Sequence, residues 1–467
     1  MAPSRRIIII GAGPGGYVAA IRAAQLGAQV TIVEEQAVGG VCLNWGCIPS
    51  KTLLGLIELG ERTRHAQAFG LRFDGDIGYD LARMIARKNA VVQSLVKGIV
   101  TLLKQWKVTH IEGRGELVSD RQVRVTQQDS TITLLDAEAI VLATGSSWPQ
   151  IPQFPIDGER VLTSKEALDL SEIPRSLVIV GGGVEGCEFA CLFSGLGTQV
   201  MLVEMMPTVL PTEDEDTVTI LTREFKKRKV QLYVNTQIKH WESTADGMKA
   251  TLSTGEELAA EKMLIAVGRR MNSRGLGLET VGVKTGVQEE ILVDEHLQTS
   301  ISGVYAIGDV TGKSMLAHVA SAQGKVAVAN AMGKPEAINY DVIPAGIFTL
   351  PEIGRVGLTE RQTKERGLSI SIGRFRYAGI GKAQAVGETV GQYKVIAEEQ
   401  SKKLLGVHII GAHSADLIHE AALAMQGGLT VMDLANMIHA HPTFSEGMME
   451  AAEDVEGLAI HQVRKRG

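Results

Sequence analysis

The chain has 467 residues, of which 45% are hydrophobic and 21% are charged, and its formal net charge is −6. This length is too great for one hydrophobic core, so about three domains are expected, and the composition is that of an ordinary soluble globular protein. The acidic balance gives no electrostatic reason to expect nucleic acid or an anionic membrane as a partner.

The N-terminal segment and the cysteine content narrow the class further. Arg5 and Arg6 precede the apolar residues 7–10, but closely spaced glycines then interrupt the apolar stretch. No other run approaches about eighteen apolar residues, so neither a signal sequence nor a membrane span is expected. Only four cysteines occur, which favours a reducing cytoplasm over a secreted disulfide scaffold. The basic run 464–466 is expected to be a solvated tail.

The first predicted unit begins with a strand at residues 7–10, continues through the loop GAGPGG and a helix, and ends in the strand TIVE at Glu34. Gly11 permits the tight turn from strand to helix, Gly13 lets the backbone approach a pyrophosphate, and Gly16 allows close packing of helix on strand. The helix N-terminus favours the diphosphate, and the Glu34 carboxylate can accept the hydroxyls of an adenosine ribose. A purely structural glycine turn is the alternative.

Cys42 and Cys47 follow this unit and are separated by LNWG, just before a helix predicted to begin near residues 48–50. Pro49 is tolerated in the first turn of such a helix. A helix N-terminus stabilises a thiolate, and two cysteines alone cannot complete a zinc site, so the pair favours redox chemistry and no metal. Buried, unreactive cysteines are the alternative on spacing alone.

Residues 177–204 repeat the pattern of residues 7–34 in constant register, reading LVIV, GGGVEG, a helix, and MLVE at Glu204. Gly181, Gly183 and Gly186 take the places of the first unit's glycines, so a second nucleotide site is predicted. A carboxylate at Glu204 repels a 2′-phosphate, which favours NAD over NADP. Each unit ends in a short buried strand, EAIVLATG in the first and KMLIAVG in the second.

The remainder of the chain has a different pattern. Short strands and loops fill residues 271–309 and finish with the strand GVYAIGD. From residue 343 onward, the strand-like segments QYKVIAEE and LLGVHIIG precede the helical segment ADLIHEAALAMQGG. This order of elements is typical of an α+β unit.

The segment GGVCLNWGCIPSKTLL, placed after a GxGxxG unit, resembles the active-site segment of the class I pyridine nucleotide-disulfide oxidoreductases. The resemblance covers essentially the whole chain and is greatest to the members that oxidise dihydrolipoamide with NAD. Its further motifs are ATGS at 143–146, GGGVEGCEFA at 181–190, AVGRRMN at 266–272, GVYAIGDVTG at 303–312, MLAH at 315–318 and HAHPTFSEGMMEAA at 439–452.

The resemblance implies FAD and NAD as cofactors and a role for each matching residue. Cys42 is the expected interchange thiol and Cys47 the thiol facing the flavin, with Lys51 and Glu188 paired beside the flavin. His441, oriented by Glu446, is the expected base and acts at the flavin site of a partner subunit, with His439 as the alternative histidine. The remaining expected cofactor-binding residues are Gly115, Thr144, Gly145, Ser146, Gly268, Asp309, Met315, Leu316, Ala317 and His318.

The implied fold class is α/β, with two Rossmann-like FAD- and NAD-binding domains and a C-terminal α+β dimerisation domain. The expected boundaries are 1–146 for the FAD-binding domain, 147–271 for the NAD-binding domain, 272–342 for a central domain that completes the FAD site, and 343–467 for the dimerisation domain. Expected partners are a second copy of the chain and a lipoyl-bearing protein of a 2-oxo acid dehydrogenase complex, of glycine cleavage or of another lipoate-linked pathway. Neither nucleic acid, membrane nor metal is expected, and the expected location is cytoplasmic.

Three positions depart from the family pattern: Glu185 stands where an aliphatic residue is usual, Val319 where lysine is frequent, and Val41 where threonine is usual. Our hypothesis is that an ionised Glu185 favours the cationic nicotinamide of NAD⁺ over neutral NADH. Cys187 and Cys191, one helical turn apart, are interpreted as small packing residues in preference to a second redox pair.

Several rival functions are weighed against these residues. Glutathione reductase-like activity is disfavoured by Glu204 and by the segment IPSK, and mercuric reductase-like activity by the lack of any cysteine beyond Cys191. Transhydrogenase-like activity does not require the Cys42/Cys47 pair. A lipoyl-linked flavoprotein subunit that only docks to a larger assembly needs neither the cysteines nor the histidine and glutamate, so their joint presence favours catalysis.

Overall fold

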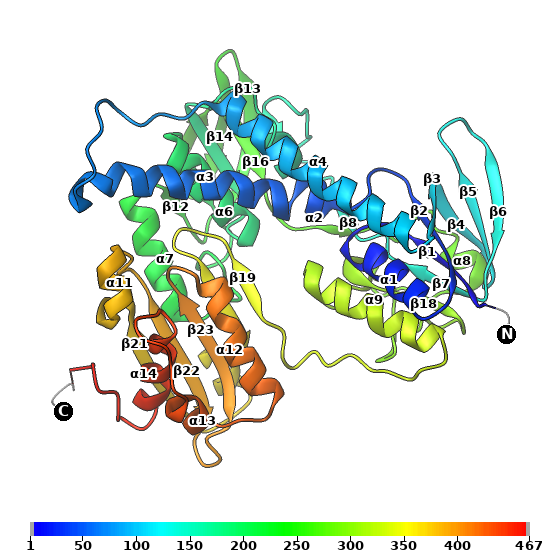
Figure 1. The fold of residues 1–467 in the computed structure, drawn as a ribbon. Coiled ribbons are helices and arrows are strands. Elements are labelled where there is room, and N and C mark those ends of the chain that lie inside the picture. The colour runs from blue at the N-terminus through cyan, green and yellow to red at the C-terminus, as the bar shows by residue number, and fades with distance from the viewer. Residues whose placement is uncertain (1–3, 464–467) are drawn as a thin grey trace.

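The computed structural model describes residues 4–463 and has two similar α/β units beside a C-terminal α+β unit (Figure 1). This architecture confirms the predicted fold class. The basic run 464–466 lies outside the described residues. Among residues 4–463, no helix has the length and apolar character needed to cross a membrane.

The first unit is built on a parallel sheet with strand order β18-β7-β1-β2-β3. These strands are β1 (Arg6–Ile10), β2 (Gln29–Glu34), β3 (Thr109–Glu112), β7 (Ala139–Leu142) and β18 (Val304–Ala306). One face packs against helices α1 (Pro14–Gln25) and α9 (Ala317–Ala331). The other packs against an antiparallel meander of β4 (Arg114–Ser119), β5 (Gln122–Thr126) and β6 (Ile132–Asp136). Because both faces are covered, residues 7–10 are buried along their whole length.

Long helices connect the first unit to the second (Figure 1). They are α2 (Gly40–Trp45), α3 (Cys47–His65) and α4 (Leu81–Gln105), with the short η1 (Ala66–Phe69) between the last two. The helix predicted from near residue 48 begins at Cys47, and Cys42 lies in the separate helix α2. The chain is helical on both sides of Gly46, so the two cysteines stand on either side of one short break.

The second unit repeats the parallel sheet with strand order β12-β11-β10-β16-β9. Its strands are β9 (Val161–Leu162), β10 (Ser176–Val180), β11 (Gln199–Val203), β12 (Gln231–Tyr233) and β16 (Lys262–Ile265), with helices α5 (Ser164–Ala167), α6 (Val184–Leu196) and α7 (Glu215–Lys227). A second meander is formed by β13 (Ile238–Thr244), β14 (Gly247–Leu252) and β15 (Glu257–Ala260). The register matches the sequence repeat, because Ile7 pairs with Val30 just as Leu177 pairs with Val200.

The chain crosses between these units and then returns to the first. β8 (Ser146–Ser147) and β17 (Arg270–Met271) pair with each other, one on the way out and one on the way back. The returning segment contains α8 (Leu278–Val281) and η2 (Gly308–Thr311), and it supplies β18 and α9 to the first unit. Residues 271–331 therefore complete the sheet that the N-terminal residues begin.

The C-terminal unit is an antiparallel sheet with strand order β19-β20-β23-β22-β21. Its elements are β19 (Ala345–Ile347), β20 (Ile353–Gly357), α10 (Glu360–Glu365), β21 (Ile370–Arg376), η3 (Tyr377–Gly379), α11 (Gly381–Val386), β22 (Gln392–Glu398), β23 (Leu404–Ile410), α12 (Ser414–Gln426), α13 (Val431–Asn436) and α14 (Glu446–Asp454). α12 packs on β20 and β23, while α14 packs on β21 and β22, and together they enclose a separate apolar core.

A buried lysine joins this C-terminal unit to the second unit. Lys394 on β22 is 1% exposed, and its Nζ lies 2.7 Å from Asp214 Oδ1, 2.8 Å from Glu360 Oε2 and 3.2 Å from Asp216 Oδ2. Hydrogen bonds from Lys364 and Lys394 lower the pKa of Glu360 to about 2. Because this pKa is depressed, the contribution of Glu360 to stability is present above its ordinary pKa and is lost as the pH falls toward 2.

We predict that Lys394→Met lowers the free energy of unfolding by about 3 kcal/mol, because it leaves buried carboxylates without their cation. Lys364→Met is the matched control, since Lys364 also pairs with Glu360 at 2.8 Å but its side chain is 69% exposed. The control should cost less than about 0.5 kcal/mol. Urea denaturation measures both values, and equal effects of the two substitutions would contradict the role assigned to Lys394.

Candidate active site

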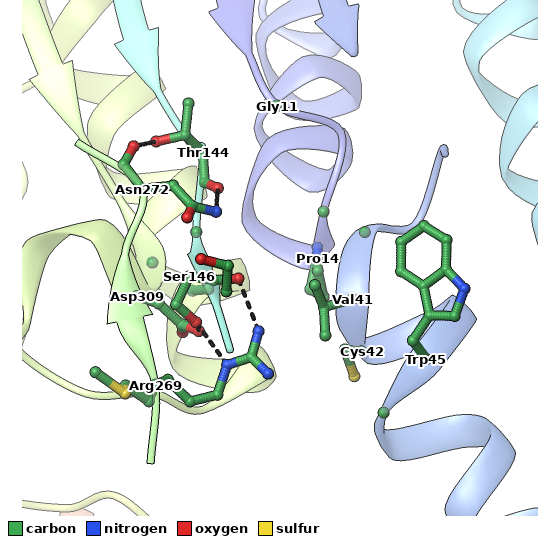
Figure 2. A pocket seen from close by; sticks show the side chains of 18 of the residues that line it. Gly11, Pro14, Val41, Cys42, Trp45, Thr144, Ser146, Arg269, Asn272 and Asp309 are labelled. Atoms are coloured by element: carbon green, nitrogen blue, oxygen red, sulfur yellow. Dashed lines mark hydrogen bonds between the residues drawn. The ribbon is translucent and has the colours of Figure 1, made fainter. Parts of the chain in front are cut away.

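One large cavity of about 830 Å³ lies between the first and second units, and residues of both units line it. This volume falls within the range of small-molecule and cofactor sites. Figure 2 shows the loop from Gly11 to Pro14 between two walls, one carrying Cys42 and Trp45, the other Arg269, Ser146 and Asp309. The cavity therefore brings together segments that are far apart in the sequence.

The redox pair predicted from the sequence is a disulfide in the wall of this cavity. Cys42 in α2 and Cys47 at the first position of α3 are bonded, with a Cα–Cα distance of 4.7 Å. No side chain caps the N-terminus of α3. The unpaired N–H groups and the helix dipole at that end stabilise negative charge, so a thiolate formed at Cys47 is favoured.

A partly buried ion pair lines the same cavity as the disulfide. Lys51 Nζ on α3 lies 2.6 Å from Glu188 Oε2 on α6, and both residues line the cavity. Glu188 is 5% exposed, and its second oxygen accepts the backbone N–H of Phe348 at 2.9 Å. The ammonium of Lys51 also lies 4.8 Å from the centre of the Phe348 ring. Lys51 is one helical turn beyond Cys47 and on the same helix face.

The first glycine loop fits a dinucleotide. Gly11 has φ +105°, and an added Cβ there would lie 2.2 Å from the Ala143 carbonyl oxygen, while a Cβ at Gly16 would lie 1.9 Å from the Gly11 oxygen. At Gly13, by contrast, a Cβ would meet only the Gly40 Cα at 3.9 Å. Gly11 and Gly16 are thus required by the protein's own packing, whereas Gly13 leaves an open surface for a ligand. α1 has no side-chain cap, so its first N–H groups can bind a pyrophosphate.

The second glycine loop has the same division of roles. Gly181 has φ +107° and would place a Cβ 2.3 Å from the Ala266 oxygen, and a Cβ at Gly186 would lie 1.9 Å from the Gly181 oxygen. A Cβ at Gly183 would meet no atom within 4 Å. Only Gly183 of these three lines the cavity, just as Gly13 lines it and Gly16 does not. α6 also begins without a side-chain cap.

The two acids that end the second strands differ in their surroundings. Glu34 lines the cavity and accepts the N–H groups of Ala12 at 2.6 Å and Gln36 at 2.8 Å. Glu204 accepts the corresponding N–H groups of Gly182 at 2.6 Å and Met206 at 2.7 Å, but it is 7% exposed and does not line the cavity. Each carboxylate is therefore fixed beside its own glycine loop.

The opposite wall is held by a chain of hydrogen bonds (Figure 2). The Ser146 hydroxyl donates to Asp309, and Arg269 donates from Nε to Ser146 Oγ at 2.9 Å and from its guanidinium to the Ser146 carbonyl at 2.7 Å. Thr144 and Asn272 exchange two further hydrogen bonds, at 2.7 and 3.0 Å. Arg269 and Asn272 were not among the residues predicted to bind a cofactor, although both follow Gly268 closely in the motif AVGRRMN.

The other residues expected to bind a cofactor fall into two groups. Those that line the cavity are Gly115, Gly145, Gly268, Met315 and Ala317. Leu316 and His318 do not line it, and the ring of His318 forms a hydrogen bond with the Pro344 carbonyl at 2.8 Å. In the segment MLAH, alternate residues thus face the cavity.

His441 and Glu446 form a pair outside the cavity of their own chain. His441 Nδ1 lies 2.8 Å from Glu446 Oε1, and the second carboxylate oxygen accepts the Thr443 N–H at 2.9 Å. Burial opposes ionisation of Glu446, but the hydrogen bonds from His441 and Thr443 outweigh it and lower its pKa. The His441 side chain is 76% exposed. A proton held on Nδ1 by the carboxylate leaves Nε2 free to accept another.

The alternative histidine is in a different state. The His439 side chain is 2% exposed, with Nε2 2.8 Å from Glu420 and Nδ1 2.9 Å from the Met437 carbonyl. The hydrogen bond to Glu420 raises the pKa of His439. Because both ring nitrogens are used within the chain, His439 has no free nitrogen to exchange protons with a substrate.

Cys187 and Cys191 are buried, unpaired thiols on α6. Burial raises the pKa of Cys187 well above its usual value and that of Cys191 to about 11. Thiols are the unreactive form, so these two cysteines pack the helix. Among residues 4–463, no cluster of three or more His, Cys, Asp or Glu side chains is suited to a metal ion.

Residues 5–324 match the family described as pyridine nucleotide-disulphide oxidoreductase, and residues 343–452 match the dimerisation domain of that family. A dihydrolipoyl dehydrogenase of Bacillus subtilis is 41% identical over 461 residues, covering 98% of this chain and 97% of the relative. Another, of Chlamydia muridarum, is 39% identical over 448 residues, covering 95% of each chain. The crystal structure of LpdA from Mycobacterium tuberculosis has a TM-score of 0.91 at 30% identity, covering 97% of this chain and 99% of that one.

We predict that Gly13→Ala folds normally but raises the dissociation constant for FAD about tenfold or more, because the protein has room for the methyl group and the bound pyrophosphate does not. The flavin absorbance of the purified protein and calorimetric titration of the apoprotein measure the effect. Gly55→Ala on α3 is the control, since a Cβ there also meets no atom within 4 Å and the residue lies outside the cavity. Equal FAD affinity in both variants would contradict the role of Gly13.

Proposed function

The chain belongs to the pyridine nucleotide-disulphide oxidoreductases, and we propose that it oxidises dihydrolipoyl groups to lipoyl disulfides, using the Cys42/Cys47 pair, FAD and NAD. The observation that carries this function is the position of the Cys42–Cys47 disulfide in the wall of a cavity that both glycine loops also line. The glycine loop of the first unit would hold FAD, which would supply the two-electron coupling between the reduced cysteine pair and the nicotinamide of NAD.

The disulfide exchange is assigned by leaving-group chemistry. A substrate thiolate attacks Cys42 Sγ, the Cys42–Cys47 bond breaks, and Cys47 leaves as a thiolate. Cys47 is the better leaving group, because the uncapped N-terminus of α3 stabilises negative charge there. The second substrate sulfur then attacks the first, which releases the cyclic disulfide and leaves Cys42 as a thiol. The substrate dithiol is oxidised, and the cysteine pair is reduced.

His441 is the base that this exchange requires. Dihydrolipoyl thiols are mostly protonated at neutral pH, so a group that titrates near neutrality must remove a proton before attack. Glu446 orients the imidazole and stabilises its protonated form, as the acid does in hydrolase triads. Of the two protons of the substrate dithiol, one ends on His441 and the other on Cys42.

The site is completed by a second copy of the chain. His441 does not line the cavity of its own chain, and α14 lies in the C-terminal unit, well separated from α2 (Figure 1). The match of residues 343–452 to a dimerisation domain supports a homodimer in which each subunit supplies the base to the other's disulfide. An isologous twofold dimer makes two such sites.

The choice of dinucleotide and of partner follows from the same chemistry. Glu204 is a fixed carboxylate beside the second glycine loop, so NAD is preferred over NADP. The physiological substrate is a lipoyl-bearing protein, of a 2-oxo acid dehydrogenase complex, of glycine cleavage or of another lipoate-linked pathway. The two unpaired thiols of α6 are consistent with a reducing cytoplasm as the location.

We predict that the FAD-loaded protein oxidises dihydrolipoamide with NAD, and that anaerobic dihydrolipoamide alone changes its oxidised flavin spectrum. Cys42→Ser should abolish both, because the attacked sulfur is missing. Cys191→Ala, which removes a cysteine outside the cavity, should retain both. An unchanged flavin spectrum with excess dihydrolipoamide would exclude the function, and a protein that only docks in a larger assembly would give that result.

A separate experiment tests whether His441 acts at the disulfide of the partner subunit. We predict that Cys47→Ser and His441→Gln are each inactive as homodimers, the latter with activity reduced about 10²- to 10⁴-fold. Mixed at equal amounts and allowed to form hybrid dimers, they should recover about a quarter of the wild-type activity, since one site of each hybrid has an intact pair and base. No recovery in verified hybrids would place the base in its own subunit.

A further inference from the structure

Glu185 is a charged side chain of the cavity wall that the proposed reaction does not use. Lys51 and Glu188 neutralise each other at 2.6 Å, and Asp309 accepts the hydroxyl of Ser146, which also binds Arg269. Glu185 also lines the cavity and is half-buried. Within the described residues it forms no ion pair, so its charge is not cancelled by direct contact with a cation.

The position of Glu185 associates it with the nicotinamide nucleotide. It is the second residue of α6, in the first turn after the glycine loop of the second unit. It is also three residues before Glu188, so the two carboxylates lie on the same face of α6. Glu188 on that face contacts Lys51, which follows Cys47 by about one turn of α3, so this face is directed toward the helix that begins with Cys47. Under the proposed function the adenosine of NAD lies near Glu204, so the nicotinamide ring is the part of NAD that extends toward Lys51 and Cys47.

We propose that the Glu185 carboxylate is a specificity-determining group that favours the cationic, oxidised nicotinamide over the uncharged, reduced one. This proposal rests on the proposed function, because it assigns the second dinucleotide site to NAD. Its consequence is weaker binding of reduced NADH, which promotes release of the product.

The electrostatic reason is a difference of one charge between the two forms of the ligand. A carboxylate a few ångströms from the ring attracts NAD⁺ and has no net charge to attract in the dihydronicotinamide. Both forms carry the same diphosphate and riboses, so the glycine loop and Glu204 hold them equally. The ratio of the two affinities therefore isolates the interaction at the ring.

The groups around Glu185 make this selectivity dependent on pH. Burial is the largest effect and raises the pKa of Glu185; the Ser164 hydroxyl and Arg269 lower the pKa, Glu188 raises it and Lys51 lowers it, and the net pKa is raised. Arg269 is held by Ser146, with its guanidinium 5.0 Å from the centre of the Trp148 ring. Because the pKa is raised, Glu185 is neutral below it and charged above it, so preference for NAD⁺ increases as the pH rises.

The test is a binding titration of the oxidised, FAD-loaded protein. The two ligands are NAD⁺ and 1,4,5,6-tetrahydro-NAD, an uncharged analogue of NADH that cannot reduce the flavin. Calorimetry or flavin fluorescence gives the two dissociation constants from about pH 5 to about pH 8.5. The variants are Glu185→Gln, which removes the charge at constant shape, and Glu242→Gln as the control. Glu242 is an exposed carboxylate on β13 of the same unit, outside the cavity.

At high pH, the ratio of the affinity for NAD⁺ to the affinity for the analogue should be about tenfold lower in Glu185→Gln than in the wild type. In Glu242→Gln this ratio should equal that of the wild type. In the wild type this ratio should decrease as the pH falls, whereas in Glu185→Gln it should stay constant. An unchanged ratio in Glu185→Gln, or an equal change in affinity for both ligands, would overturn the proposal. Dihydrolipoamide oxidation by the same samples tests the proposed function separately. Failure of the Glu185 proposal is therefore distinguishable from failure of the proposed function.

Discussion

The ion pair between Lys51 and Glu188 is the contact on which the arrangement of the cavity depends. It joins α3, which begins with a redox cysteine, to α6, which begins beside the second glycine loop. The second oxygen of Glu188 accepts a backbone N–H from Phe348 of the C-terminal unit. A carboxylate buried to this degree is costly unless it is paired and hydrogen-bonded, so the three regions of the chain must keep their relative positions.

The two nucleotide-binding units have glycine loops of the same backbone geometry. In each, one glycine makes a turn with positive φ against a backbone carbonyl, another lets the helix touch that turn, and a third leaves room for a ligand. The units differ in what their helices face. α1 is covered by the returning helix α9, whereas α6 packs against α3 and carries carboxylates into the shared cavity. Duplication of one nucleotide-binding unit thus yields two sites that meet at a single reactive region.

The C-terminal unit contributes in two separate ways. Its buried Lys394, surrounded by carboxylates of two regions, fixes it against the second unit. Its His441 and Glu446 stand on an exposed segment that does not reach the cavity of the same chain. A base that acts on another subunit must be exposed and must be held in a fixed position. The exposed His441 and the fixed C-terminal unit together meet both requirements.

Local patterns along the chain were enough to predict the features that depend on backbone geometry. The constant register between residues 7–34 and 177–204 predicted both nucleotide-binding units, because glycine positions and strand lengths are fixed by backbone geometry. The spacing of Cys42 and Cys47 before a helix predicted redox chemistry, and the family resemblance predicted the pairing of Lys51 with Glu188. The helix predicted to begin near residues 48–50 begins at Cys47, and the short helix α2 that carries Cys42 was not predicted.

Which polar groups meet depends on how the chain packs in three dimensions. His439 and His441 are the same residue type, two positions apart. In the folded chain, however, His439 is buried against the Glu420 carboxylate, whereas His441 is exposed. Arg269 and Asn272 take part in the cavity wall through contacts with residues more than a hundred positions away. The carboxylates around Lys394 likewise come from separate elements. Hydrogen bonds and charge pairs of this kind depend on distance and burial, which a pattern along the chain does not contain.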